Sequence, residues 1–250
     1  MKKITVHINR VKKILLDIFF PESCICCSEF GEMICENCRE DIKKDKTKNS
    51  NLKGIEWVHS FLNYKNKNFK DVLFSIKYHY VKSATKYLSL ILYLDFYEFI
   101  KEKLLICDKK DLIIIPIPIS KKRLIERDYN QTEILIKDTT KEIKNNLKLD
   151  LENNIYIDLL IKNKHTIKFA ETHSSTERED LIKNAFIVRE PISSLLFINS
   201  KKSLEEFLEN KTIILFDDIT TTGSTFYEAR NTLVKAGAKK ENIFGYAIAH

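Results

Sequence analysis

Short runs of apolar residues along this chain predict buried strands, and longer stretches with helical spacing of apolar positions predict helices. The predicted strands lie at residues 55–64, 112–115, 186–188, 213–216 and 243–248. The predicted helices lie at residues 1–20, 69–76 (capped by Asn68), 83–105, 131–143 and 226–236. Strands that alternate with helices predict a doubly wound α/β fold with a parallel sheet. In that architecture ligands bind beyond the carboxyl ends of the strands.

Two segments are less regular in their pattern. Residues 155–161 fit either a strand or a short helix, and residues 163–180 are polar and predict a mobile loop.

The same pattern predicts how the chain is divided into domains. Residues 1–50 are expected to form a helix and a small cysteine-rich unit, and residues 51–250 the α/β domain.

The composition fits one sizeable domain with a small appendage, because 44% of the 250 residues are hydrophobic. The longest apolar stretch, residues 88–99, contains two carboxylates and is too short to span a bilayer. Charges also interrupt any secretion-signal core near the N-terminus. We therefore expect a cytoplasmic protein without a membrane span. A packed helix is the favoured interpretation of residues 14–20 (ILLDIFF), with peripheral contact at the inner face of a membrane as the alternative.

The chain is basic, with a formal net charge of +7, and the positive charge is concentrated in two segments. Residues 65–82 carry five lysines against one aspartate, and residues 120–127 carry four cations against one glutamate. Clustered cations suit the phosphates of a small ligand or of nucleic acid. A solvated lysine-rich surface is the alternative interpretation of both segments.

Five of the six cysteines lie between residues 24 and 38. Cys24 with Cys27, and Cys35 with Cys38, form two C-x-x-C pairs separated by a short loop. Two such pairs predict a closed tetrahedral site, for which zinc is the expected metal. Disulfides are disfavoured without an export signal. We expect a structural zinc ion that supplies much of the folding energy of this small unit. Cys26 has no assigned role.

The segment 213–225 (IILFDDITTTGST) is the strongest functional signal in the chain. An apolar strand leads into Asp217 and Asp218, and a hydroxyl-rich loop with one glycine precedes a helix. The candidate anion-binding residues are Thr220, Thr221, Thr222, Gly223, Ser224 and Thr225. Backbone N–H groups at the start of a helix favour a phosphate, and the carboxylates suit ribose hydroxyls or Mg²⁺. The alternatives are a solvated acidic pair with an ordinary loop, and a Walker B strand, which lacks its P-loop partner here.

The helix after this loop has predicted ends. Thr225 is the expected N-cap, with Glu228 three residues later in capping-box spacing. Gly237 is the expected stop, because glycine readily adopts the left-handed conformation that follows a helix.

A second candidate phosphate site follows the strand at residues 112–115, which ends in the sequence Pro-Ile-Pro. The segment after it contains Lys121 and Arg127, which lie just past a strand end and can reach the same crevice as the acidic pair. A pyrophosphate group needs such cations. The outer face of a surface helix is the alternative interpretation for Lys121 and its neighbour Lys122.

Residues 213–225 resemble the motif of type I phosphoribosyltransferases that binds 5-phosphoribosyl-1-pyrophosphate (PRPP). The order of the other motifs extends the resemblance over essentially the whole chain. These motifs are the paired C-x-x-C, Tyr64, Lys77-Tyr78, Pro-x-Pro, Arg127-x-Tyr129-Asn130-Gln131, Glu177-Arg178 and the C-terminal acidic string. Together they resemble the ComF family of phosphoribosyltransferase-like proteins.

The resemblance implies a type I phosphoribosyltransferase fold with an N-terminal zinc unit, and Mg²⁺ bound with PRPP. It implies that Asp217 and Asp218 hold the ribose hydroxyls, that residues 221–225 hold the 5-phosphate, and that Lys121 and Arg127 serve as further PRPP contacts. The family acts in natural transformation, which implies DNA uptake with single-stranded DNA and with uptake or recombination proteins as partners. The chain departs from the family at Asp128, where glycine is usual, and at Leu181, where asparagine is usual.

Two functions fit these residues. The first is an enzyme that transfers a phosphoribosyl group to an unknown acceptor, for which the sequence identifies no catalytic residue. The second is a non-catalytic module that keeps a PRPP pocket and binds single-stranded DNA or a partner protein. In that second hypothesis, Trp57, Tyr64 and Tyr78 stack on bases beside lysines, although aromatic residues in strands more often belong to the core.

Overall fold

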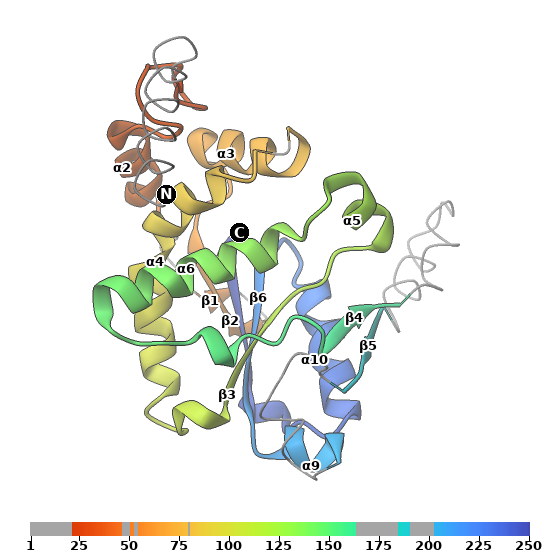
Figure 1. The fold of residues 1–250 in the computed structure, drawn as a ribbon. Helices are drawn as coiled ribbons and strands as arrows, with labels where there is room; N and C mark the ends of the chain where they lie inside the picture. Colours follow the sequence, from red (N-terminus) through yellow and green to blue (C-terminus); the bar gives the residue numbers. More distant parts are fainter. Residues whose placement is uncertain (1–21, 47–50, 53–54, 80, 164–184, 191–202) are drawn as a thin grey trace, which may run out of the picture.

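The structure is a computed structural model that describes residues 22–46, 51–52, 55–79, 81–163, 185–190 and 203–250. Across these residues the centre is a sheet with the strand order β1-β2-β7-β6-β3 (Figure 1). Its strands are β1 (Asn51–Leu52), β2 (Ile55–Leu62), β3 (Leu112–Pro116), β6 (Thr212–Ile219) and β7 (Ile243–Ala249). All except β1 run parallel to their neighbours, as the continuous apolar runs predicted.

Helices cover both faces of this sheet (Figure 1). The first face carries α3 (Lys67–Tyr78), α4 (Ala84–Lys103) and α6 (Gln131–Leu147). The second face carries α9 (Leu204–Glu209), α10 (Ser224–Lys235) and a hairpin of β4 (Leu160–Lys162) with β5 (Phe186–Val188). Side chains alternate across each strand, so Ile214 and Phe216 pack toward the first face and Ile213 and Leu215 toward the second. The predicted α/β class with helices on both faces is confirmed.

Several predicted boundaries move in the structure. The strand predicted at residues 213–216 extends to Ile219, so the acidic pair lies inside β6 instead of after it. Helix α3 begins at Lys67, and its N-cap is Asn66, whose side chain accepts a hydrogen bond from the N–H of Phe69. The prediction of Asn68 as the cap was therefore wrong by two positions. In the ambiguous segment 155–161, Ile155 forms an isolated bridge to β3, and β4 begins only at Leu160.

The cysteine-rich unit leads into helix α2 (Glu36–Lys44) and packs against the first helical layer. Ile34 and Ile42 are buried in the same apolar cluster as Phe69 and Leu88. The predicted helix at residues 1–20 and most of the predicted loop at residues 163–180 lie outside the described residues. Among the described helices, none combines the length and apolarity that a membrane crossing requires.

Candidate functional site

The two adjacent carboxylates near the end of β6 point to opposite faces of the sheet, because successive side chains of a strand alternate. Asp218 lies on the face of α3 and α6 and is almost fully buried. Its Oδ2 is 2.9 Å from Nζ of Lys77 and accepts a 3.0 Å hydrogen bond from Nε2 of Gln131. Asp218 is therefore held by one residue from each of these two helices.

Asp217 has a different environment on the second face. Its Oδ1 accepts a 2.8 Å hydrogen bond from the backbone N–H of Asp218. Burial, reinforced by the negative charge of Asp218, raises the pKa of Asp217 to about 8, against the opposing influence of Lys77 and Lys162. This environment therefore favours the neutral form of the Asp217 carboxyl more than water does. The nearby Lys162, on β4, has a lowered pKa because of its burial.

A tight turn connects β6 to α10 and positions the hydroxyl-rich loop. Gly223 has φ +75°, a left-handed backbone conformation that favours glycine. A Cβ at that position would displace Cδ1 of Ile55 in β2. Helix α10 begins directly after it at Ser224, without a side-chain cap. The prediction that Thr225 caps this helix was therefore wrong, because the chain is already helical at Thr225.

The predicted anion-binding residues lie together around this turn. The N–H of Thr220 donates to the carbonyl of Ala249 in β7, which fixes the start of the loop at the sheet. Thr221 and Thr222 are exposed, and Ser224 and Thr225 are half-buried in the first turn of α10. The Thr222 and Ser224 hydroxyls are hydrogen-bonded to each other. The geometry therefore presents hydroxyls and a helix N-terminus next to the acidic pair, an arrangement able to bind an anion.

The two cations of the second candidate phosphate site differ in exposure. The predicted basic loop is a helix, α5 (Lys121–Arg127), capped by the side chain of Ser120. Lys121 is exposed at its start, whereas Arg127 is buried at its end. Asp128 then adopts the left-handed conformation, with φ +61°. Aspartate is one of the few residues other than glycine that tolerate this conformation.

The segment from Arg127 to Gln131 ties several elements together. The hydroxyl of Tyr129 donates to the carbonyl of Ile76 in α3 at 2.5 Å. The side chain of Asn130 donates to the carbonyl of Ile117, just after β3, and accepts from the N–H of Thr132 as the N-cap of α6. Arg127 and Gln131 are hydrogen-bonded to each other at 2.9 Å. The turn between α5 and α6 is thus anchored to α3, to β3 and, through Gln131, to β6.

Sequence reasoning did not identify Lys77 and Gln131 as neighbours of Asp218. Both were noted only as parts of motifs. Arg127 and Gln131 are only four residues apart, but they lie on different helices, so their contact depends on the turn between α5 and α6. No local signal connects Lys77 with Asp218, because they are distant in the chain and meet only when α3 packs on the sheet.

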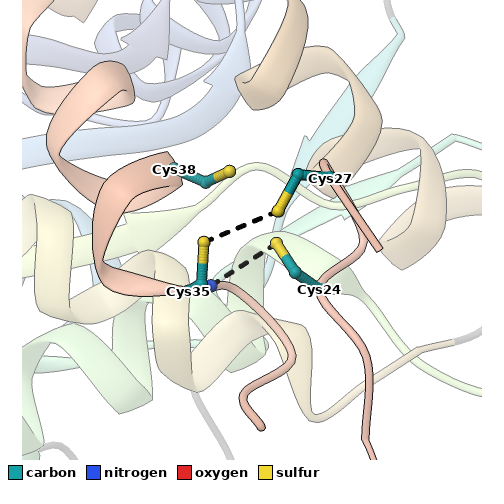
Figure 2. Close-up of side chains that lie close together, drawn as sticks. All are labelled: Cys24, Cys27, Cys35 and Cys38. Carbon is teal, nitrogen blue, oxygen red and sulfur yellow. Dashed lines mark hydrogen bonds between the residues drawn. The ribbon is translucent and has the colours of Figure 1, made fainter. Parts of the chain in front are cut away.

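The four predicted metal ligands are clustered (Figure 2). The Sγ atoms of Cys24, Cys27, Cys35 and Cys38 all lie within 4.8 Å of one another, and those of Cys27 and Cys35 are 3.7 Å apart. Tetrahedral zinc with Zn–S bonds of about 2.3 Å separates its sulfurs by about 3.8 Å. The four cysteines therefore lie close enough together to hold a metal ion such as zinc. They are the one such group of three or more potential ligands that the described residues contain.

Local structure explains how the cysteines converge. The N–H of Ser28 donates to the carbonyl of Cys24, which closes a tight turn around the first pair. Cys35 is the N-cap of α2 and Cys38 lies in its first turn, so the second pair is presented by a helix N-terminus. The unit thus presents its first pair from a tight turn and its second pair from the start of a helix.

The thiols of this unit differ in acidity. Burial raises the pKa of Cys24, but hydrogen bonds from backbone N–H groups, including that of Cys35, lower it overall to about 6. Burial raises the pKa of Cys38. Burial likewise raises the pKa of Cys26 to about 12, and its thiol contacts the carbonyl of Asn68 at 3.5 Å. Cys26 lies outside the four-cysteine group.

A scan of the sequence against protein-family models finds no match, and a search of curated proteins finds none either. What is established is an α/β protein with a parallel sheet between helices and an N-terminal four-cysteine group. The resemblance to the ComF family stays a prediction.

Proposed function

We propose that the residues at the carboxyl ends of β3 and β6 bind PRPP together with Mg²⁺, in a phosphoribosyltransferase-like protein. The observation that carries this proposal is the Gly223 turn. It completes the four-residue connection, residues 220–223, that joins the acidic end of β6 to the N-terminus of α10, so that ribose and phosphate contacts adjoin each other. By its resemblance to the ComF family, the protein acts in natural transformation, on incoming single-stranded DNA.

The residues divide the ligand among them in this proposal. Residues 221–225 hold the 5-phosphate, Asp217 and Asp218 address the ribose hydroxyls, and Lys121 and Arg127 belong to the pyrophosphate side. The described residues provide no cluster of three carboxylates around the acidic pair. This arrangement is compatible with Mg²⁺ that is bound to the pyrophosphate oxygens when PRPP enters the site. Mg²⁺ usually keeps several waters and binds substrate phosphates together with one or two carboxylates. Such an ion would neutralise charge on the leaving group.

The enzymatic form of the proposal is transfer of the phosphoribosyl group. The bond between C1 of the ribose and pyrophosphate breaks, pyrophosphate departs with the bonding electrons, and a nucleophilic acceptor forms the new bond to C1. The role of the protein is then to orient the ribose and to stabilise the negative charge on the leaving group. The acceptor and any catalytic base are not assigned to residues of this chain.

The four-cysteine group is proposed to hold one structural zinc ion. Four thiolates close the tetrahedral coordination shell and leave no position for a substrate. The burial of Cys24 and Cys38 against the first helical layer fits a bracing role.

Calorimetric titration of the zinc-loaded protein with PRPP and Mg²⁺ tests the proposal. We expect micromolar binding that is lost in Asp217→Ala/Asp218→Ala. The second variant, Thr222→Ala/Ser224→Ala, removes two loop hydroxyls without touching the core and should weaken binding at least tenfold. Asn231→Ala, on the exposed face of α10, is the matched control and should bind normally. Absence of binding by well-folded native protein would refute the proposal.

A second candidate function, a single-stranded DNA-binding module, is favoured by exposed aromatic residues on α3. Phe74 and Tyr78 are about half exposed, and their ring centroids are 4.8 Å apart. Lys70, on the same helix, lies over the ring of Tyr64. Aromatic faces beside lysines are suited to stacked bases and phosphates. Trp57, the third aromatic residue of the hypothesis, packs against α10 instead.

Fluorescence anisotropy with a labelled oligothymidylate tests this second function. We expect binding that weakens steeply between about 50 and about 200 mM salt. Phe74→Ala should reduce it, whereas Leu94→Ala, an equally exposed apolar residue on α4, should not. No binding by the native protein at low salt would exclude this function.

A further inference from the structure

Lys77 and Asp218 form an ion pair in a part of the site that is largely closed to water. The side chains are 18% and 6% exposed, and the charged atoms are 2.9 Å apart. Removing two charges from water is costly, and their attraction offsets this cost only when the geometry is good and further hydrogen bonds satisfy the remaining polar atoms. Gln131 supplies one such bond, to the same Oδ2 of Asp218. The carboxylate is thus held from two sides.

The orientation of the Gln131 amide is set by Arg127. Oε1 of Gln131 accepts from Nη1 of Arg127, so the amide nitrogen must face Asp218. The guanidinium of Arg127 lies 5.4 Å from the ring centre of Tyr78 and is buried beneath it. A buried chain of contacts therefore runs from Arg127 through Gln131 to Asp218, where it meets Lys77. Hydrogen bonds linked in this way strengthen one another in a site of low dielectric.

The two adjacent carboxylates are held in place to different degrees. Asp218 has two side-chain partners on the face of α3 and α6. Asp217, on the opposite face, receives a hydrogen bond from the backbone of its neighbour. A ligand that sits over the end of β6 therefore meets one carboxylate whose direction is fixed in advance. Fixing a binding group before the ligand arrives reduces the entropy that binding must otherwise overcome.

We propose that Lys77 and Gln131 are positioning residues of the sugar-phosphate site, which hold the Asp218 carboxylate in one orientation, with Arg127 acting through Gln131. The inference rests on the proposed function, because its consequence is PRPP affinity. Lys77 and Gln131 would act in this way without contacting the ligand. Their substitution should weaken PRPP binding only through Asp218.

A double-mutant cycle in PRPP binding tests the inference on the zinc-loaded full chain. Lys77→Met removes the charge at similar length and should weaken binding at least tenfold. Lys77→Arg restores a cation and should recover part of that loss. In the Asp218→Asn background, Lys77→Met should cause little further loss. Lys67→Met, at an exposed lysine at the start of the same helix, is the matched control and should bind as the native protein does.

Substitutions of Gln131 test separately whether its amide holds Asp218. Gln131→Glu keeps the shape but places a second carboxylate against Asp218, and should weaken binding more than Gln131→Met. Thermal unfolding without ligand supplies a readout that is independent of PRPP. Lys77→Met and Asp218→Asn should each lower the midpoint, and the double variant should lose less than the sum, because neither charge is then left buried alone.

These measurements distinguish failure of the positioning role from failure of the proposed function. Equal PRPP affinity in the native protein and Lys77→Met would overturn the positioning role and leave the proposed function standing. So would strictly additive losses in the binding cycle. Failure of the native protein to bind PRPP would overturn the proposed function itself, and with it the task assigned to Lys77 and Gln131.

Discussion

At the scale of single residues, the acidic pair shows what a sequence reveals and what it conceals. Two adjacent aspartates after an apolar run were recognisable as a candidate site from their types and order. Their different environments were not, because the predicted strand ended before them and no face could be assigned. Once β6 extends to Ile219, alternation places Asp217 and Asp218 on opposite faces. Their partners, Lys162 on one side and Lys77 on the other, come from distant segments.

The raised pKa of Asp217 predicts a dependence of stability on pH. Its pKa rises from 3.8 to about 8 on folding, so the folded state holds a proton there that the unfolded chain has lost. This residue therefore contributes stability in full below pH 4, and the contribution is lost as the pH rises through about 8. Asp217→Asn cannot ionise and should escape that loss. Its melting temperature relative to the native protein should climb between about pH 4 and about pH 8.

Thermal unfolding of the zinc-loaded protein at a series of pH values provides the measurement. The control is Asp108→Asn, at an exposed aspartate that pairs with a surface lysine. Its melting temperature should follow that of the native protein across the pH series. The expected titration would be contradicted if the difference in melting temperature between Asp217→Asn and the native protein stayed constant from about pH 4 to about pH 8.

At the scale of elements, the long central strands were predictable and the short helix α5 was not. Strands β3, β6 and β7 are buried on both faces, so each appears in the sequence as an unbroken apolar run. Helix α5 has seven residues, and its apolar members Leu124 and Ile125 are adjacent and exposed. It therefore lacks the three-to-four residue periodicity from which helices are predicted. Its stability depends on local caps, the hydroxyl of Ser120 and the left-handed Asp128.

The loop after β6 shows a similar limit. Its residue types predicted a connection between a strand and a helix, which is present, whereas its binding of an anion stays a prediction. The position of the first helical residue depended on the backbone of Gly223, whose left-handed conformation fits against Ile55 of another strand. A contact of that kind has no signature within the loop itself. Helix α10 accordingly starts two residues earlier than a helix capped by Thr225 would allow.

At the scale of the whole molecule, the four-cysteine unit and the candidate site are joined by a single helix. The carboxylate of Asp41 in α2 accepts hydrogen bonds from Asn66 and Asn68, which lie at the start of α3. The thiol of Cys26 contacts the carbonyl of Asn68. The other end of α3 carries Lys77, which pairs with Asp218. The cysteine spacing predicted the metal group, but its contact with α3 depends on packing across the domain.

Loss of the metal should therefore disturb α3 as well as the cysteine unit. Binding of zinc by small cysteine units contributes about 10 kcal/mol or more, so we expect chelation to lower the melting temperature by at least about 10 °C. Hydrogen exchange should accelerate in residues 36–44 and in the first turns of α3, while β6 and β7 stay protected. PRPP affinity should fall as Lys77 loses its fixed position.

Two neighbouring cysteines provide a matched pair of variants for this prediction. Cys27→Ala removes one of the four grouped thiols and should reproduce the effects of chelation, with zinc content well below one ion per chain. Cys26→Ala leaves the group intact and should retain the metal. Equal zinc content in the two variants would refute the proposed ligand set. Unchanged exchange in α3 after complete metal removal would show that the cysteine unit folds on the surface of the domain without bracing it, and that the site at β6 is built by the sheet and its helices alone.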